Sequence, residues 1–409
     1  MKAIKKKPST VAAFVGLFLI VAGASWALFS AIGSKAGLSD EGLTSARSQI
    51  EQLPKTEECP LNGKYYTKVE RSIWEERRPM GIVIENHLDA RPQSGMSRAD
   101  VIYEAIAEGG ITRFLSMFYC GASAEDVTVG PVRSARVYFI DWVAEYSDAP
   151  LFVHFGGANN ICANAEDPQC QEDGTKLPGK VDPKVMALEH LIDLGWRHSE
   201  GNALDGGANV SYPAIKRDQY RLGEEPAAWE HSAIGSTDLL FRLGIERGFG
   251  YTGDGGAWNK DFDSWIFVDE SPSTNPDATT ISFEFWSNKP DYDVSWEYDK
   301  DTNAYVRVNG GKPHTDWEYD NEQLTAKNIV IQFIEEEGPV DEELHLYYET
   351  EGSGDAMVFQ NGTVVEGTWE KPSESERTKF FDGEGKEIPF VRGTIWIEGI
   401  PIGNEILYN

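Results

Sequence analysis

The sequence predicts an α+β protein, in which an α/β-like N-terminal domain with a mixed sheet is followed by a β-rich C-terminal domain. Between residues 80 and 248, apolar runs typical of strands alternate with segments of helical periodicity. After residue 280 the pattern changes to strands separated by short turns. The length of 409 residues suits two domains and exceeds one ordinary core.

The first 33 residues predict a transmembrane anchor. Lysines at 2, 5, 6 and 7 precede residues 11–32, an apolar run without charge that is long enough to cross a bilayer. Basic residues before this run place the N-terminus in the cytoplasm and the bulk of the chain outside the cell. A cleaved signal peptide is the alternative. No Cys follows the run, which argues against a lipid-modified N-terminus, and residues 34–64 are interpreted as a spacer.

The N-terminal α/β domain is expected over residues 65–270. Residues 80–86 have the pattern of a buried strand, and 111–119 carries apolar residues on both faces, as an inner strand does. Residues 99–107 fit a strand or a helix. The sequence further predicts a strand at 126–130, a helix within 128–146, a strand at 149–155, and amphipathic helices at 184–196 and 235–248.

The C-terminal β-rich domain is expected over residues 278–409, after a cluster of Pro, Ser, Asp and Thr at 269–280. Asn361-Gly362 predicts a type I′ hairpin turn between two of its strands. The predicted strands are 281–286, 294–300, 304–310, 328–337, 344–351, 356–370, 378–382 and 392–400.

Charge and cysteine content restrict the function further. The formal net charge of −30 disfavours nucleic-acid binding, which needs a basic surface. Four cysteines in an exported chain permit disulfides, and we expect Cys162–Cys170 and Cys59–Cys120. Zinc is the competing interpretation, but C-x-x-C spacing and neighbouring histidines are missing. We expect no metal site, and no phosphate-loop or dinucleotide fingerprint indicates a cofactor.

The segment 130–136, GPVRSAR, predicts an anion site. Arg133 and Arg136 stand where a helix is expected to start, a position that disfavours cations unless an anion faces them. Ser134 could cap this helix. The anion is either a carboxylate of the chain or a phosphate or carboxylate ligand. Arg113 and Arg217 are further candidate ligand-binding residues, and the internal candidates are Glu85, Glu104, Glu108, Asp141 and Asp218.

Two residues are secondary candidates for catalysis. Glu108 precedes two glycines and could act as a general base, although a carboxylate in such a place more often pairs with arginine. His154 ends an apolar strand just before Gly156-Gly157, where a ligand could approach the backbone closely. The ordinary interpretation of this residue is a satisfied histidine beside a turn.

Long stretches of the chain resemble the YerB-like family of exported bacterial proteins, whose domains are of unknown function. The resemblance is carried by residues 78–119, 130–157, 310–316, 324–333, 366–390 and 393–401. It implies two domains and a location at the outer face of the cell membrane. Family members are typically lipid-anchored, whereas this chain has an apolar run in that place.

Three functions remain open. The first is a cell-envelope binding protein whose arginine site holds an anionic envelope component or a partner protein. The second is an envelope enzyme that acts on a phosphate- or pyrophosphate-linked glycan, an idea that rests on analogy alone. The third is a structural or assembly factor that interacts through its C-terminal domain.

Overall fold

The computed structural model describes residues 47–48, 50–161, 180–253 and 256–409. Within them, Gln52–Asn409 form one unit. The expected anchor at 11–32, much of the spacer and the Cys162–Cys170 pair lie outside the described residues. In the described ranges, no helix combines the length and the apolar character needed to cross a membrane.

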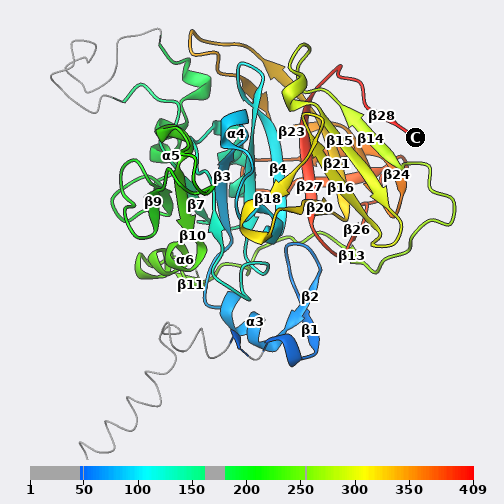
Figure 1. Ribbon diagram of the computed structural model, residues 1–409, viewed down its shortest axis with the longest axis horizontal. Coiled ribbons are helices and arrows are strands. Elements are labelled where there is room, and N and C mark those ends of the chain that lie inside the picture. The colour runs from blue at the N-terminus through cyan, green and yellow to red at the C-terminus, as the bar shows by residue number, and fades with distance from the viewer. Residues whose placement is uncertain (1–46, 49, 162–179, 254–255) are drawn as a thin grey trace, which may run out of the picture. The chain divides into compact units, whose positions relative to one another are not determined.

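The fold is mainly β, so the expected α+β class with an α/β-like N-terminal domain is wrong. Strands make up 39% of the structure and helices 16%. The predicted helical periods are present but short, because no α-helix in the described part exceeds ten residues. These helices are α3 (Lys68–Trp74), α4 (Val137–Ala144), α5 (Ala187–Asp193) and α6 (Thr237–Glu246), shown in Figure 1.

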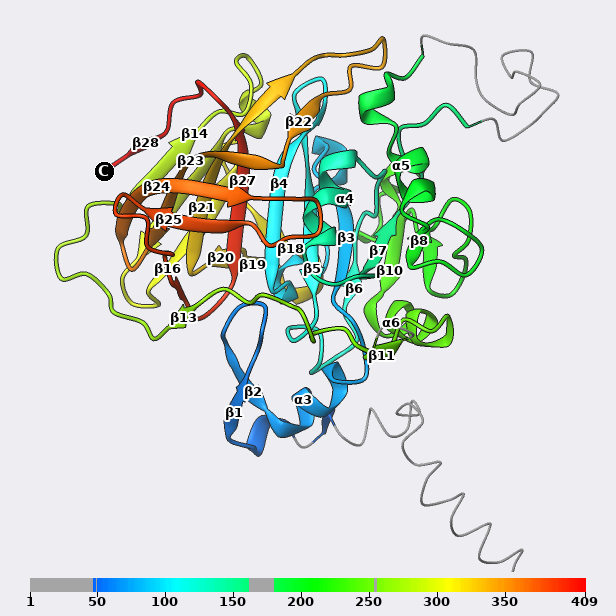
Figure 2. The same ribbon diagram turned by 180° about the vertical axis from the view of Figure 1, so that it is seen from behind.

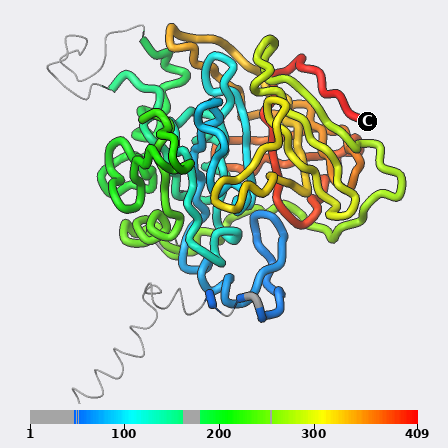
Figure 3. Tube along the Cα trace, viewed as in Figure 1, coloured from blue at the N-terminus to red at the C-terminus, as the bar shows by residue number. Residues whose placement is uncertain are grey.

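One eleven-stranded sheet runs through both halves of the chain (Figures 1 and 2). Its path is β25 (Lys379–Asp382), β24 (Thr363–Lys371), β23 (Gly352–Gln360), β21 (Asn328–Glu337), β27 (Ile395–Pro401), β4 (Val101–Glu108), β5 (Ile111–Phe118), β3 (Met80–Glu85), β7 (Leu151–His154) and β8 (Ala203–Asp205), with β22 (Tyr347–Glu349) beside β21. The halves meet where β27 pairs in parallel with β4, red beside cyan in Figure 3.

The central strands are buried on both faces, which explains their almost continuous apolar sequences. All residues of β3 and β27 are buried, as are seven of the eight residues of β4. The ambiguous segment 99–107 is therefore mostly strand β4. Its connection to β5 is an antiparallel hairpin rather than a helical crossover, which is why no α/β layer forms here.

A six-stranded sheet covers one face of the large sheet. Its Trp296 ring lies 5.1 Å from Trp396 of β27. Side chains alternate along a strand, so Tyr103 of β4 points to the other face, where its ring stacks on Trp142 of α4 at 5.0 Å. The six strands are β14 (Thr280–Phe283), β15 (Val294–Asp299), β16 (Ala304–Asn309), β17 (Lys312–Pro313), β20 (Thr325–Ala326) and β28 (Leu407–Tyr408).

Short sheets complete the unit. A three-stranded sheet beside the site described below contains β6 (Thr128–Val129), β10 (Ala233–Ser236) and β9 (Ile215–Arg217). Two-stranded pairs are formed by β1 (Lys55–Glu58) with β2 (Tyr65–Thr67), β11 (Thr252–Gly253) with β12 (Gly256–Ala257), β13 (Phe267–Val268) with β26 (Phe390–Val391), and β18 (Thr315–Asp316) with β19 (Glu322–Gln323).

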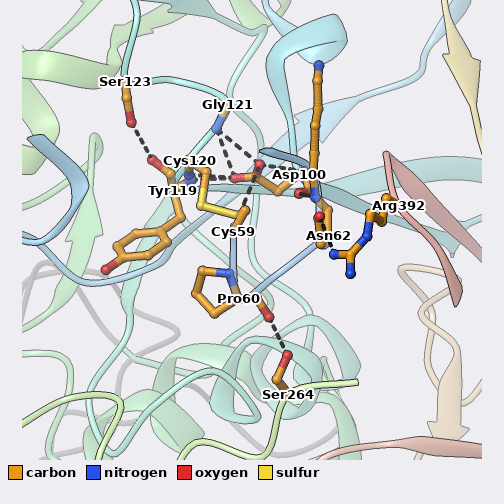
Figure 4. The surroundings of a disulfide bond; sticks show 12 residues. Cys59, Pro60, Asn62, Asp100, Tyr119, Cys120, Gly121, Ser123, Ser264 and Arg392 are labelled. Atoms are coloured by element: carbon orange, nitrogen blue, oxygen red, sulfur yellow. Dashed lines mark hydrogen bonds between the residues drawn. A yellow bond between two sulfur atoms is a disulfide. The ribbon is translucent and has the colours of Figure 1, made fainter. Parts of the chain in front are cut away.

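Two local predictions are confirmed. Cys59 and Cys120 form a disulfide, which ties the loop between β1 and β2 to the chain that follows β5 (Figure 4). Beside it, Asp100 accepts hydrogen bonds from the backbone N–H groups of Tyr119 and Cys120. Asn361 and Gly362 have positive φ angles of 56° and 75° between β23 and β24, as a type I′ turn requires.

Candidate functional site

The segment 131–135 lies between the end of β3, where Val132 bridges Ile84, and the residues that follow β7, where Ala135 bridges Gly157. The backbone N–H of Arg133 donates to Val83 O at 2.9 Å, and the N–H of Glu85 donates to Pro131 O at 2.9 Å. On the other side, the N–H of Ala135 donates to Gly156 O at 2.9 Å. The arginine side chains are thereby brought to the ends of β3, β4 and β5.

The expected helix start is misplaced. Helix α4 begins at Val137, with Arg136 at its N-cap in an extended conformation, so Arg133 stands before the helix. Ser134 does not cap it, because its hydroxyl donates to Phe155 O at 3.2 Å. Backbone hydrogen bonds to β3 and to the residues that follow β7 therefore keep residues 131–135 out of the helix.

Glu108, at the end of β4, joins two of the predicted arginines. Its two carboxylate oxygens accept one hydrogen bond each, from Arg113 on β5 and from Arg136. Burial would raise the pKa of Glu108, but the two guanidiniums outweigh burial and hold this pKa at about 2. Burial and the neighbouring Arg136 lower the pKa of Arg113 to about 10. The pair of arginines thus faces an anion that belongs to the chain.

Glu85, at the end of β3, is the second internal anion. One carboxylate oxygen lies 3.0 Å from Arg133 Nε, and the other lies 2.8 Å from His231 Nδ1. Arg133 also donates from Nη1 to Glu230 O at 3.2 Å. Its side chain remains 26% exposed, whereas that of Glu85 is 4% exposed. Among Arg113, Arg133 and Arg136, Arg133 is therefore the one that solvent reaches.

Arg217 and Arg221 add positive charge next to Glu85. The guanidinium of Arg217 lies over the Phe155 ring at 4.1 Å and over the Trp229 ring at 5.1 Å, and it donates to Trp229 O. The exposed ring of Trp229 extends this surface. Arg221 is buried and donates to three carbonyl oxygens, those of His231, Pro92 and Ala90.

The cluster carries more guanidinium than carboxylate charge. We define the arginine cluster as five arginines and the three carboxylates whose charges act on them. The arginines are Arg113, Arg133, Arg136, Arg217 and Arg221, and the carboxylates are Glu85, Glu108 and Glu230. In a chain of net charge −30, this local excess of positive charge favours an anion.

His154 has a structural environment. It is fully buried, its Nδ1 lies 2.8 Å from Gly156 O, and its ring stacks on Phe152 at 5.2 Å. Burial lowers the pKa of His154. These contacts hold the turn at Gly156 through Nδ1, while Nε2 is buried without a hydrogen-bond partner among the described residues.

Besides Asp100 with the disulfide-bonded Cys59 and Cys120, two groups of described residues have ligand atoms close enough for a metal ion. His87, Asp89 and His231 form one group, but the two imidazole rings stack at 4.8 Å with an angle of 12°. A metal ion lies close to the plane of each ring that binds it, and nearly parallel stacked rings offer no shared plane. The other group is Asp141, His190 and Glu374, in which His190 Nε2 already lies 2.6 Å from Glu374.

The structure brings Arg113, Arg133, Arg136 and Arg217 together at one edge and places Glu108 among them. Sequence reasoning proposed Glu85 and Glu108 as partners only within a group of five carboxylates. It did not identify Trp229 or Glu230, which lie in a loop that carries the short 3-10 helix Trp229–His231 and shows no chemical pattern. The fold brings that loop to the cluster by pairing β10 with β6 and β9.

Two family models define the class of protein to which this chain belongs. Residues 66–192 match the family model described as the N-terminal domain of a protein of unknown function (DUF3048), and residues 281–397 match the C-terminal domain of the same description. The chain belongs to this two-domain, YerB-like family.

A Bacillus subtilis (strain 168) protein, described as "Putative lipoprotein YerB", is 28% identical over 360 residues, which are 87% of this chain and 89% of that protein. The crystal structure of YerB protein from Bacillus subtilis is similar, with a TM-score of 0.62 and 26% identity. The match covers 86% of this chain and 100% of that one.

Proposed function

We propose that this protein is a membrane-associated, extracytoplasmic binding protein of the cell envelope, and that the arginine cluster binds an anionic envelope ligand. The observation that carries the proposal is the excess of five arginines over three carboxylates in a strongly acidic chain. Arg133 and the half-buried Arg217 form the accessible part of the cluster. Trp229 supplies an adjoining aromatic surface.

Binding is favoured over catalysis by the state of Glu108. A carboxyl group whose pKa is about 2 is ionised at neutral pH, but it is a very weak base. It is also fully engaged by two guanidiniums, which it would have to leave in order to take a proton. Glu108 therefore orients Arg113 and Arg136 in this proposal, and the ligand meets Arg133 and Arg217.

The binding test uses full-length protein in detergent, titrated with phosphate and with pyrophosphate in a calorimeter. We expect the double variant Arg133→Gln/Arg217→Gln to bind at least tenfold more weakly than wild type. The matched control is Arg71→Gln, since Arg71 is half exposed on α3 and pairs with Glu57 and Glu75. Equal affinities in all three proteins, or no binding by wild type, would contradict the proposal.

The membrane attachment is proposed to occur through residues 11–32. The apolar run supports this assignment, as does the likeness to a relative described as a lipoprotein. We expect wild type to remain in the membrane fraction after alkaline carbonate extraction and to be digested by protease added outside spheroplasts. Deletion of residues 1–33 should leave the protein out of the membrane fraction. Extraction of wild type by carbonate would contradict the assignment.

A further inference from the structure

A cavity lies away from the arginine cluster, between the end of α4, residues 261–263 and the segment that links β24 to β25. Its volume is about 440 Å³, within the range of small-molecule sites. Its base is formed by buried Glu145 and Arg377, and its rim includes the exposed Asp261, Glu370 and Glu376.

Arg377 is held rigidly at this base. It is 5% exposed, and its guanidinium lies 3.5 Å from the centre of the Trp265 ring and 4.2 Å from that of Tyr146. The aromatic rings cover the guanidinium, and within the described residues none of its three nitrogens makes a well-formed hydrogen bond. The nearest carboxylate oxygen, Glu145 Oε2, is 3.5 Å from Nη1.

The base holds more buried cations than buried anions. Glu145 is shared by Arg377 and by the fully buried Lys371, whose Nζ lies 3.2 Å from Glu145 Oε1. Lys371 also donates to the carbonyl oxygens of Glu374 and Glu376. Two buried cations therefore share one buried anion, an arrangement that a further anionic group would stabilise.

The rim has the opposite charge. Asp261, Glu370 and Glu376 are exposed acids, whereas the cation at the rim, Lys379, is already paired with Asp263 at 2.6 Å. A simple anion would be repelled by this rim and by the net charge of −30. A ligand with a carboxylate at one end and an ammonium group at the other satisfies base and rim together.

We propose that this cavity binds a small zwitterion, such as a dipeptide with free termini. Its carboxylate accepts hydrogen bonds from the edge of Arg377, and its ammonium group lies among the rim acids. The geometry suits this pairing because a guanidinium edge matches a carboxylate in a fork of two parallel hydrogen bonds. The site shares no residue with the arginine cluster, so each can fail without the other.

The test titrates full-length protein in detergent with alanyl-alanine, its N-acetyl derivative and its C-terminal amide. We expect the free dipeptide to bind at least tenfold more tightly than either blocked form. Arg377→Gln should abolish binding. The rim variant, Asp261→Asn/Glu370→Gln/Glu376→Gln, should bind the free dipeptide about tenfold more weakly than wild type does. It should bind the N-acetyl form at least as tightly as wild type does.

The controls separate the two sites and guard against misfolding. Arg133→Gln/Arg217→Gln should bind the dipeptide as wild type does. If Arg377→Gln does not fold, the rim variant decides, because its three positions are exposed. The proposal is overturned if wild type does not bind the free dipeptide, if the three probes bind equally, or if the rim variant binds the free dipeptide as wild type does.

Discussion

Glu108 explains why two arginines stand close to a helix start. The unfavourable interaction of a cation with a helix N-terminus is about 0.3–1 kcal/mol, less than the gain from a charge-assisted hydrogen bond. Arg136 at the N-cap of α4 is neutralised by Glu108, which also binds Arg113. The carboxylate thus places negative charge where the helix favours it, and Arg133 is left to Glu85 and to solvent.

Replacing Glu108 by Gln should destabilise the protein in a pH-dependent way. The folded-state pKa of about 2 lies below the ordinary 4.5, so the stabilisation is complete above pH 4.5 and is lost as pH falls toward 2. A shift of this size corresponds to roughly 3 kcal/mol in the free energy of unfolding at neutral pH. Urea unfolding of both proteins at pH 7 and pH 3 should show the difference shrinking in acid.

The control for this measurement is Glu125→Gln. Glu125 is 48% exposed and pairs with Arg98 at 3.3 Å, so its removal should change stability by less than about 1 kcal/mol. A Glu108→Gln variant that loses no more stability than this control would show that the Arg113–Glu108–Arg136 contact contributes little.

At the scale of elements, the Cys59–Cys120 disulfide holds the N-terminal hairpin. The bridge closes a loop with a sequence separation of 61 residues, and both cysteines are fully buried. Closing a loop of this size is expected to stabilise the folded state by roughly 2–4 kcal/mol. Cys59→Ser/Cys120→Ser should therefore unfold at lower urea concentration, and reductant should lower the midpoint of wild type only. Equal midpoints for both proteins would contradict this.

The hairpin turn at Gly362 gives a second element-scale prediction. Its φ of 75° disfavours side chains, and a Cβ would lie 2.6 Å from the Tyr298 ring and 2.8 Å from Pro276. Gly362→Ala should reduce the free energy of unfolding by about 1–3 kcal/mol. The matched control is Gly383→Ala, where a Cβ meets nothing within 4 Å and φ is not in the left-handed region. Similar melting temperatures for the two variants would refute the expectation.

The sequence pattern predicted a strand, helix or turn correctly where the residues of that element determine its structure by themselves. Strands β3 and β5, helices α5 and α6 and the Asn361-Gly362 turn all lie within segments that the sequence indicated. It misplaced the start of α4, because residues 131–135 pair with distant backbone, which no periodicity reveals. Arg133 and Arg136 were found by their position close to a helix start, whereas their carboxylate partners depend on where the ends of β3 and β4 lie in the fold.

At the scale of the whole molecule, the two family domains share one sheet. Strand β27 pairs with β4 across nearly 300 residues of sequence, a contact that local patterns could not predict. Arg307 of β16 reinforces this junction: fully buried, it binds Glu104 of β4 and lies 3.2 Å from Glu398 of β27. The Trp296 indole also donates to Glu398 at 3.2 Å. This buried network joins the two halves and the two large sheets.

Replacing Arg307 by Met should therefore destabilise both halves together. The variant leaves Glu104 and Glu398 buried without their cation, a loss that typically amounts to about 3–5 kcal/mol. Because β27 and β4 belong to one sheet, hydrogen exchange should accelerate by similar factors in β3 and β5 and in β23 and β24. Arg307→Met/Glu104→Gln/Glu398→Gln replaces both buried carboxyl groups and should recover part of the stability. Faster exchange confined to β23 and β24 would show instead that the halves unfold independently.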